Sequence, residues 1–86
     1  ITTVTANYTV TDEDHTILTN GSSVLNVGLP SAVTNSNYVY NVKNVSTNAI
    51  TISAAAGNID GQSSQAICQQ FENITVQSDG SNWFII

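Results

Sequence analysis

Only one stretch of the sequence carries a dense set of ionisable side chains, and it consists of Asp12, Glu13, Asp14 and His15. Carboxylate oxygens are the ligands that Ca²⁺ prefers, and the ion takes about six to eight oxygens. Consecutive residues of a strand point to opposite faces, so four in a row converge on one ion only in a turn. We therefore favour an acidic turn exposed to solvent over a metal site, and the sequence predicts no bound metal.

The single histidine, His15, is the only side chain that could serve as the base of a nucleophilic site. A Ser, Cys or Thr becomes a nucleophile only beside a base that a third group orients, and no motif places His15 near Cys68. Three copies of His15 could bind a metal on a three-fold axis, but an exposed or hydrogen-bonded histidine is the favoured interpretation. We predict that the chain is not an enzyme and needs no cofactor.

Three aromatic residues could instead recognise a sugar, because an aromatic face suits the apolar C–H side of a pyranose ring. These residues are Tyr38, Tyr40 and Trp83. Strand alternation places the two tyrosines on one face that is predicted to be part of the core. A sugar platform is therefore the less favoured interpretation of these side chains.

The size of the chain bounds how it can be stabilised. Its 86 residues form a single predicted domain, residues 1–86, and a chain of this length buries only about 60% of the surface exposed by its unfolded form. Disulfides, metals or oligomerisation usually supplement so small a core. The single Cys68 excludes an internal disulfide, so oligomerisation is the favoured supplement.

The charge balance excludes one large class of partners. Lys43 is the only cation, against six acidic residues and a formal net charge of −5, so a phosphate backbone would find almost nothing to neutralise it. No apolar run approaches the roughly 18 to 20 residues that span a bilayer. The sequence predicts neither nucleic-acid binding nor membrane insertion, and its uncharged polar surface suits an extracellular setting. Because the chain begins at Ile1, we interpret it as a processed fragment or an excised domain.

Apolar and polar residues alternate with a period of two over most of the chain, which is typical of β-strands, and no segment has helical spacing. Leu25, Val27 and Leu29 should share one face, and Pro30 should end their strand because it has no N–H to donate. The same alternation pairs Ile50 with Ile52. The fold class predicted here is all-β, with seven or eight short strands.

Two turns predict β-hairpins. Asn20-Gly21 lies between two strand-like runs, as in a type I′ turn, and Ser46-Thr47-Asn48 separates a strand at Tyr38–Lys43 from the next. In the Tyr38–Lys43 run, Tyr38, Tyr40 and Val42 should face the core. Hairpins at both places would make neighbouring strands antiparallel.

The chain ends in four large apolar residues, and terminal segments normally fray unless they join a sheet. In a final strand, Trp83 and Ile85 would face one way and Phe84 and Ile86 the other. One face can belong to the core, and we predict that Phe84 and Ile86 form a subunit interface, where aromatic residues are enriched. The alternative is a central strand whose second face is covered by loops.

Five short stretches together resemble the carboxy-terminal domain of bacteriophage and other viral tail fibre, tailspike and fibre-knob proteins. They are Asp14–Leu18, Leu29-Pro30, Tyr40–Asn44, Ile59-Asp60-Gly61 and Ser78–Phe84. The resemblance implies a homotrimeric β-structured tip of a viral fibre, located on the virion surface, that attaches to a glycan or protein on the host cell or holds three chains in register. Cys68 departs from the pattern, and we expect its thiol to be buried like a small hydrophobic side chain.

The fold expected on these grounds is a small antiparallel β-sandwich or jelly-roll-like domain that assembles as a homotrimer. Loops on a rigid scaffold most often carry recognition, so we expect two polar loops at one end of the domain to contact the receptor. The candidate contact residues are Asn20, Gly21, Ser22, Ser23, Thr34, Asn35 and Asn37.

Two other functions remain open from the sequence. The domain could be a purely structural trimerisation or capsid-decoration module without a ligand. It could also be a monomeric carbohydrate-binding module of a secreted protein, which would expose an aromatic platform.

Overall fold

The computed structural model of the protein describes all 86 residues and contains nine β-strands and no helix. The strands are β1 (Thr2–Val4), β2 (Tyr8–Thr9), β3 (Thr16–Thr19), β4 (Leu25–Leu29), β5 (Val39–Asn44), β6 (Ile50–Ala54), β7 (Ser64–Ile67), β8 (Asn73–Ser78) and β9 (Trp83–Ile85). The all-β prediction is confirmed. No segment forms a helix that could cross a lipid bilayer.

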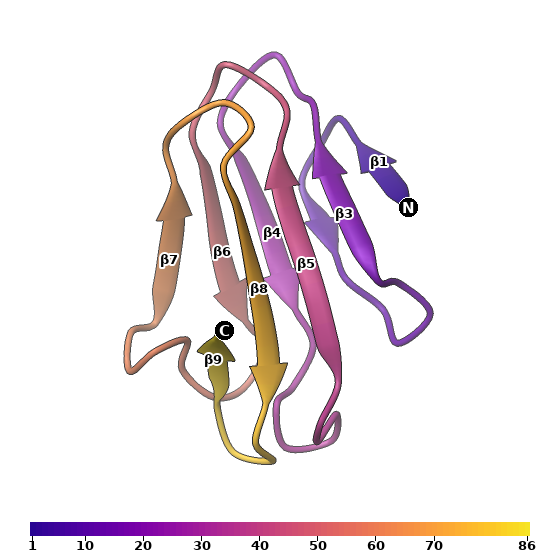
Figure 1. The fold of residues 1–86 in the computed structure, drawn as a ribbon, viewed down its shortest axis with the longest axis vertical. Coiled ribbons are helices and arrows are strands. Elements are labelled where there is room, and N and C mark those ends of the chain that lie inside the picture. Colours follow the sequence, from indigo (N-terminus) through magenta and orange to yellow (C-terminus); the bar gives the residue numbers. More distant parts are fainter.

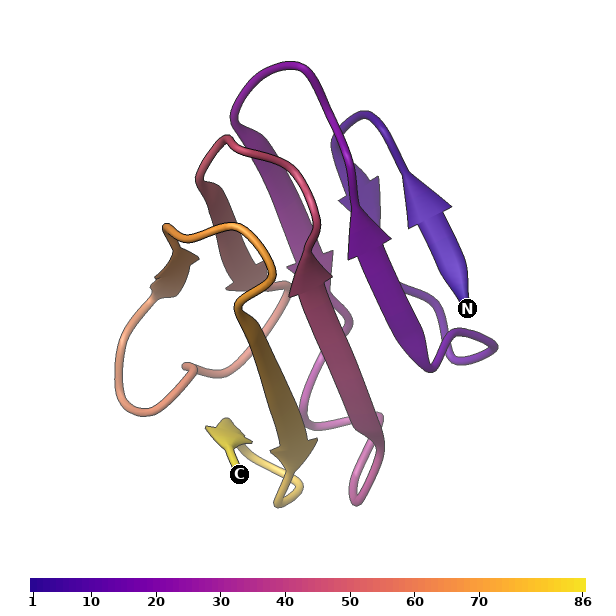
Figure 2. The ribbon, with the colours of Figure 1, turned by 45° about the horizontal axis from the view of Figure 1, so that its top comes forward.

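The strands form two sheets that pack face to face (Figure 1). Sheet A has the strand order β1-β3-β5-β8-β9, and sheet B has the order β2-β4-β6-β7. From β1 to β6 each strand lies in the opposite sheet from the one before it (Figure 2). The chain therefore makes three turns around the core, which we call coils, and each coil consists of one strand of sheet A followed by one strand of sheet B. Strands β7, β8 and β9 then close one side of both sheets.

The pairing within the sheets corrects one part of the expected fold. Strands two apart along the coils are parallel, as in β3 beside β5 and β4 beside β6, whereas β7, β8 and β9 join by antiparallel pairing. The two-layer arrangement is consistent with a sandwich. The prediction of an antiparallel or jelly-roll arrangement is wrong, because the coils bring parallel strands side by side.

Both predicted hairpins are wrong for the same reason: the strands that flank each turn lie in different sheets. A type I′ turn requires positive φ at both central residues, and neither Asn20 nor Gly21 has a positive φ. The segment from Asn20 to Val24 instead carries the chain from sheet A to sheet B. The segment from Val45 to Ala49 makes the same crossing between β5 and β6.

A buried asparagine organises the crossing after β5. The side-chain oxygen of Asn44 accepts hydrogen bonds from the N–H of Ser46 at 3.0 Å and from its hydroxyl at 2.8 Å, and its amide donates to the Asn48 carbonyl at 2.7 Å. The hydroxyl of Thr19 also donates to the Asn44 oxygen, at 3.3 Å. Asn44 is fully buried, so these bonds satisfy polar groups that water cannot reach.

The core lies between the sheets and contains the inward-facing residues that alternation predicts. The buried hydrophobic residues are Val4, Val10, Ile17, Leu25, Val27, Leu29, Ala32, Tyr40, Val42, Ile50, Ile52, Ile59, Ile67, Val76 and Trp83. The predicted faces of β4, β5 and β6 are confirmed, and β4 ends before Pro30 as expected. Tyr38 lies before β5 and is exposed, so its predicted place in the core is wrong.

The loops gather at the two ends of the sandwich. One end, which we call the Asn20 end, carries the β1–β2, β3–β4, β5–β6 and β7–β8 connections, at the top of Figure 1. The other, which we call the Asn37 end, carries the β2–β3, β4–β5, β6–β7 and β8–β9 connections. The whole length of β5 separates Asn20 from Asn37, because Thr19 lies beside Asn44 at one end of that strand and Asn37 precedes its other end.

Candidate functional site

The Asn37 end is built around the side chain of Trp83. Its indole is fully buried and its ring centroid lies 5.6 Å from that of Tyr40 in a tilted arrangement. The indole N–H donates a hydrogen bond of 3.0 Å to the carbonyl of Pro30. Pro30 directly follows β4 of sheet B. Its carbonyl therefore lies beyond the strand pairing of that sheet and can accept the indole N–H of Trp83 in sheet A.

The outer edge of β9 is paired with the β6–β7 connection. The N–H of Trp83 donates to the carbonyl of Asn58 at 2.8 Å, and the N–H of Asp60 donates to the carbonyl of Trp83 at 3.0 Å. The carboxylate of Asp60 accepts the N–H of Ile85 at 3.0 Å. These bonds, together with the pairing to β8, hold the final strand within the sheet.

The turn between β8 and β9 is held by two side chains. One oxygen of Asp79 accepts the N–H groups of Ser81 and Asn82, both at 2.9 Å, and Gly80 takes a positive φ of 96° that glycine adopts without strain. The side chain of Asn82 accepts the N–H of Asn58 at 2.9 Å. The predicted turn from Ser78 to Ser81 is therefore confirmed.

Four of the five stretches that carry the family resemblance thus meet at Trp83: Leu29-Pro30, the tyrosine of Tyr40–Asn44, Ile59-Asp60-Gly61 and Ser78–Phe84. Their bonds and contacts position the end of the chain. We conclude that most of this motif serves the fold.

The fifth stretch begins with Asp14, which joins the first coil to the turn before β3. Its carboxylate accepts hydrogen bonds from the hydroxyls of Thr2 at 3.0 Å and Tyr8 at 2.8 Å, and from the N–H of Thr11 at 2.8 Å. Thr2 belongs to sheet A and Tyr8 to sheet B, so one carboxylate bridges the two layers. Both of its oxygens are therefore used within the fold.

This bridge predicts a stability change with pH. Burial raises the pKa of Asp14, but the hydrogen bonds from Thr11, Tyr8 and Thr2 outweigh it and leave the pKa below the ordinary value of 3.8. A carboxyl group with a lowered folded pKa stabilises the protein above its unfolded pKa, and this contribution is lost as the pH falls through the folded pKa.

We therefore expect the free energy of unfolding to fall below about pH 4, and to fall less steeply in Asp14→Asn than in the wild type. Urea titrations followed by circular dichroism between pH 2 and pH 7 measure this difference. The matched control is Asp12→Asn, in the same turn but exposed and without a side-chain hydrogen bond. Equal slopes in the wild type and Asp14→Asn would contradict the bridging role.

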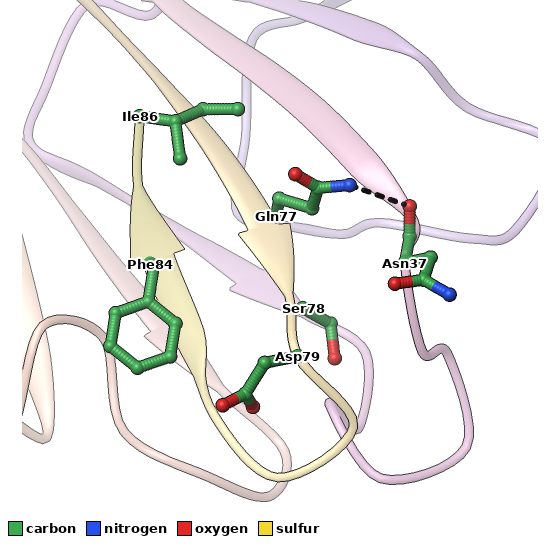
Figure 3. A pocket seen from close by; sticks show the side chains of 6 residues that line it. All are labelled: Asn37, Gln77, Ser78, Asp79, Phe84 and Ile86. Atoms are coloured by element: carbon green, nitrogen blue, oxygen red, sulfur yellow. Dashed lines mark hydrogen bonds between the residues drawn. The ribbon is translucent and has the colours of Figure 1, made fainter.

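A shallow hollow of about 190 Å³ opens beside the β8–β9 turn, and Figure 3 shows the side chains around it. It is lined by Asn37, Gln77, Ser78, Asp79, Phe84 and Ile86. The antiparallel pairing of β5 with β8 brings these parts of the chain together, since Val39 lies opposite Gln77 and Gln77 lies opposite Phe84.

Phe84 and Ile86 form the apolar part of the hollow. Because Trp83 is buried, the alternating side chain of Phe84 points out of sheet A and is 43% exposed, and Ile86 is 68% exposed. The predicted faces of the last strand are confirmed in this respect. The use of Phe84 and Ile86 as a subunit interface stays a prediction.

The polar part of the hollow combines a charge with amide groups. The Gln77 amide donates to the Asn37 carbonyl at 3.3 Å, as the dashed line in Figure 3 marks. The N–H groups of Asn82 and Ser81 lower the pKa of Asp79, so this carboxylate is charged at neutral pH. Only one of its oxygens accepts these bonds, which leaves the second for a ligand.

The structure divides the predicted contact residues between the two ends. Asn20, Gly21, Ser22 and Ser23 lie at the Asn20 end, whereas Thr34, Asn35 and Asn37 lie in the β4–β5 connection at the other. Of all seven, the hollow includes only Asn37. The prediction that both loops share one end is wrong, because β4 lies between the two connections and carries the chain from one end of the sandwich to the other.

Tyr40 lies in the core, as the favoured interpretation expected, and Trp83 is buried as well, so neither can be a platform for a sugar. One expectation about a single residue needs correction. Cys68 is exposed rather than buried, since it follows β7 at the Asn20 end. Phe84 is the aromatic side chain that the hollow offers, and sequence alternation could have identified it once Trp83 was assigned to the core.

Searches of protein-family models, curated proteins and solved structures found no match to this chain.

Proposed function

We propose that the chain is an attachment domain at the tip of a viral fibre, exposed on the virion surface, that binds a host-cell receptor through the hollow at the Asn37 end. The resemblance of the five motif stretches supports the fibre assignment. The observation that carries the attachment role is the hollow itself, which joins exposed Phe84 and Ile86 to the polar residues Asn37, Gln77 and Asp79.

The location of the hollow suits attachment. Its floor is fixed, because the adjacent Trp83 is buried and Ser78 donates a hydrogen bond of 2.6 Å to the Ala32 carbonyl. Sites on rigid elements lose less conformational entropy on binding than sites on mobile loops. The exposed phenyl ring of Phe84 can therefore contact a ligand without reorganising the fold.

A homotrimer is part of this proposal. A shallow hollow of this size makes few contacts, so a single copy would bind weakly. Three linked copies convert the second and third contacts into intramolecular events, and such multivalency raises the overall affinity by about 10² to 10⁴ when the geometry allows it. A trimeric fibre tip would therefore attach firmly through individually weak sites.

Adsorption to intact cells tests the attachment role. We expect the fluorescently labelled domain, displayed as a trimer, to adsorb to some strains of a bacterial panel, and Phe84→Ala to reduce adsorption at least about tenfold through loss of its aromatic contact. The matched control is Phe71→Ala, which removes a ring that is 60% exposed at the Asn20 end. No adsorption to any strain, or equal losses in both variants, would contradict the proposal.

The structural trimerisation module is the second candidate, because Phe84 and Ile86 could be covered by sister chains instead of a receptor. A stable interface buries about 800 Å² on each partner, which is roughly a fifth of the 4497 Å² that the whole chain exposes, so residues besides these two would have to contribute. Sedimentation equilibrium of the wild type and of a Phe84→Ser, Ile86→Ser double variant separates the two candidates. A trimer that dissociates in the variant favours the structural module.

A further inference from the structure

The chemistry of the hollow specifies the kind of receptor group that it fits. We infer that it binds a single uncharged pyranose ring, stacked on Phe84 and hydrogen-bonded by Asp79 and the amides of Asn37 and Gln77, and that it discriminates against acidic sugars. This inference rests on the proposed attachment function and names the ligand class of that same site.

The size of the hollow matches one small ring. A volume of about 190 Å³ is close to that of an engineered cavity of about 150 Å³ that binds benzene, so the hollow suits one six-membered ring. The hollow is open on one side, so a bound ring could continue into a longer saccharide outside it. This geometry fits the terminal sugar of a saccharide.

The arrangement of apolar and polar groups matches the two sides of a pyranose. The face of an aromatic ring carries a partial negative charge, which attracts the C–H groups on one side of the sugar. Figure 3 shows the Phe84 ring beside the Asp79 carboxylate, with Gln77 and Asn37 across the hollow. Hydroxyl groups at the rim of a stacked sugar would thus meet one carboxylate and two amides.

Charge explains why the sugar should be neutral. Asp79 is ionised at neutral pH, and no cation lines the hollow. The chain carries a net charge of −5, and its only basic side chain, Lys43, does not line the hollow, because it lies opposite Asn73 at the other end of the β5–β8 pair. A carboxylate-bearing sugar would therefore enter a negative field without a counter-charge.

Titration of the protein with methyl glycosides tests the inference. The probes are the neutral methyl β-D-glucopyranoside, methyl β-D-galactopyranoside and methyl N-acetyl-β-D-glucosaminide, and the acidic methyl α-glycoside of N-acetylneuraminic acid. We expect at least one neutral probe to bind with a dissociation constant on the order of millimolar, as a small contact allows, and the acidic probe to bind more weakly. Phe84→Ala should weaken neutral binding about tenfold, and Phe71→Ala should leave it unchanged.

The variant Asp79→Asn isolates the effect of charge. Its side-chain oxygen can still accept the N–H groups of Ser81 and Asn82, so the turn is retained while the charge is removed. We expect the affinity for the acidic probe relative to the neutral one to rise about fivefold. An unchanged ratio, or tighter binding of the acidic probe by the wild type, would overturn the inference.

Cell adsorption separates failure of this inference from failure of the attachment role. Periodate oxidises sugar diols and spares most peptide backbone. A protease cleaves the peptide backbone and leaves saccharides intact. Adsorption that depends on Phe84, survives periodate and is abolished by protease would leave the attachment function standing and refute a saccharide ligand. Failure of every neutral probe to bind would likewise refute it, whatever the adsorption result.

Discussion

Replacing Trp83 with alanine is expected to lower the free energy of unfolding by about 3 to 5 kcal/mol, the usual cost of truncating a buried Trp or Phe. The indole fills the space between the two sheets against Tyr40, and its N–H satisfies the Pro30 carbonyl. A domain of this size is stable by only about 5 to 10 kcal/mol, so the variant should be largely unfolded on modest heating. Urea titration followed by far-UV circular dichroism measures the change.

Two further variants make the test specific. Trp83→Phe keeps most of the apolar volume and loses the N–H, so its cost should lie near 1 to 2 kcal/mol, about that of one buried hydrogen bond. Phe84→Ala, one residue along the same strand, removes an exposed ring and should cost less than about 1 kcal/mol. A smaller loss in Trp83→Ala than in Phe84→Ala would show that β9 is not held as the structure describes.

Replacing Asn44 with alanine should cost about 2 to 4 kcal/mol, because it leaves the buried Ser46 N–H without an acceptor and removes the other hydrogen bonds of a buried network. The side chain satisfies the N–H and hydroxyl of Ser46, the hydroxyl of Thr19 and the carbonyl of Asn48. These groups hold the crossing from β5 to β6, so the loss should also loosen the Asn20 end. Urea titration gives the stability, and amide hydrogen exchange locates the loosening.

Asn26→Ala is the matched control for Asn44→Ala. Asn26 is also a strand asparagine, but it lies in β4 with its side chain exposed on the outer face of sheet B. Its truncation should change the free energy of unfolding by less than about 1 kcal/mol. If the two asparagine variants lost the same stability, the buried network would not organise the crossing.

Alternation along single strands was enough to predict which residues face the core. Leu25, Val27 and Leu29 are buried as expected, and so is the Ile50 and Ile52 pair, because a two-residue period depends only on the local strand. The pairing of strands could not be predicted in this way. A pattern such as Asn20-Gly21 suggests a tight turn locally. The two flanking strands, however, bury their apolar faces equally well when the chain crosses from one sheet to the other.

The candidate site was predictable only in pieces. Alternation placed Phe84 and Ile86 on one face, and loop composition suggested Asn37, but nothing in the sequence connected them. Their meeting depends on the antiparallel pairing of β5 with β8, in which Val39 lies opposite Gln77. This pairing joins segments almost forty residues apart, and no local pattern specifies it.

Most motif residues serve the fold, although Ser78, Asp79 and Phe84 also line the hollow. Asp60 and Asp79 each accept backbone N–H groups that hold the end of the chain, and Asp79 alone also borders the hollow. The five stretches therefore determine how the domain closes at the Asn37 end. Under the proposed function, the exposed side chains beside these structural residues would determine which receptor is bound.

Amide chemical-shift mapping by NMR tests the central claim, that the hollow at the Asn37 end is the contact surface, most directly. During titration with a neutral methyl glycoside that binds, the account predicts the largest shifts at the amides of Gln77 and Phe84 and at the Asn37 loop, with little change at the opposite end. Shifts centred on Asn20 to Ser23, or shifts that leave Phe84 unaffected, would contradict it.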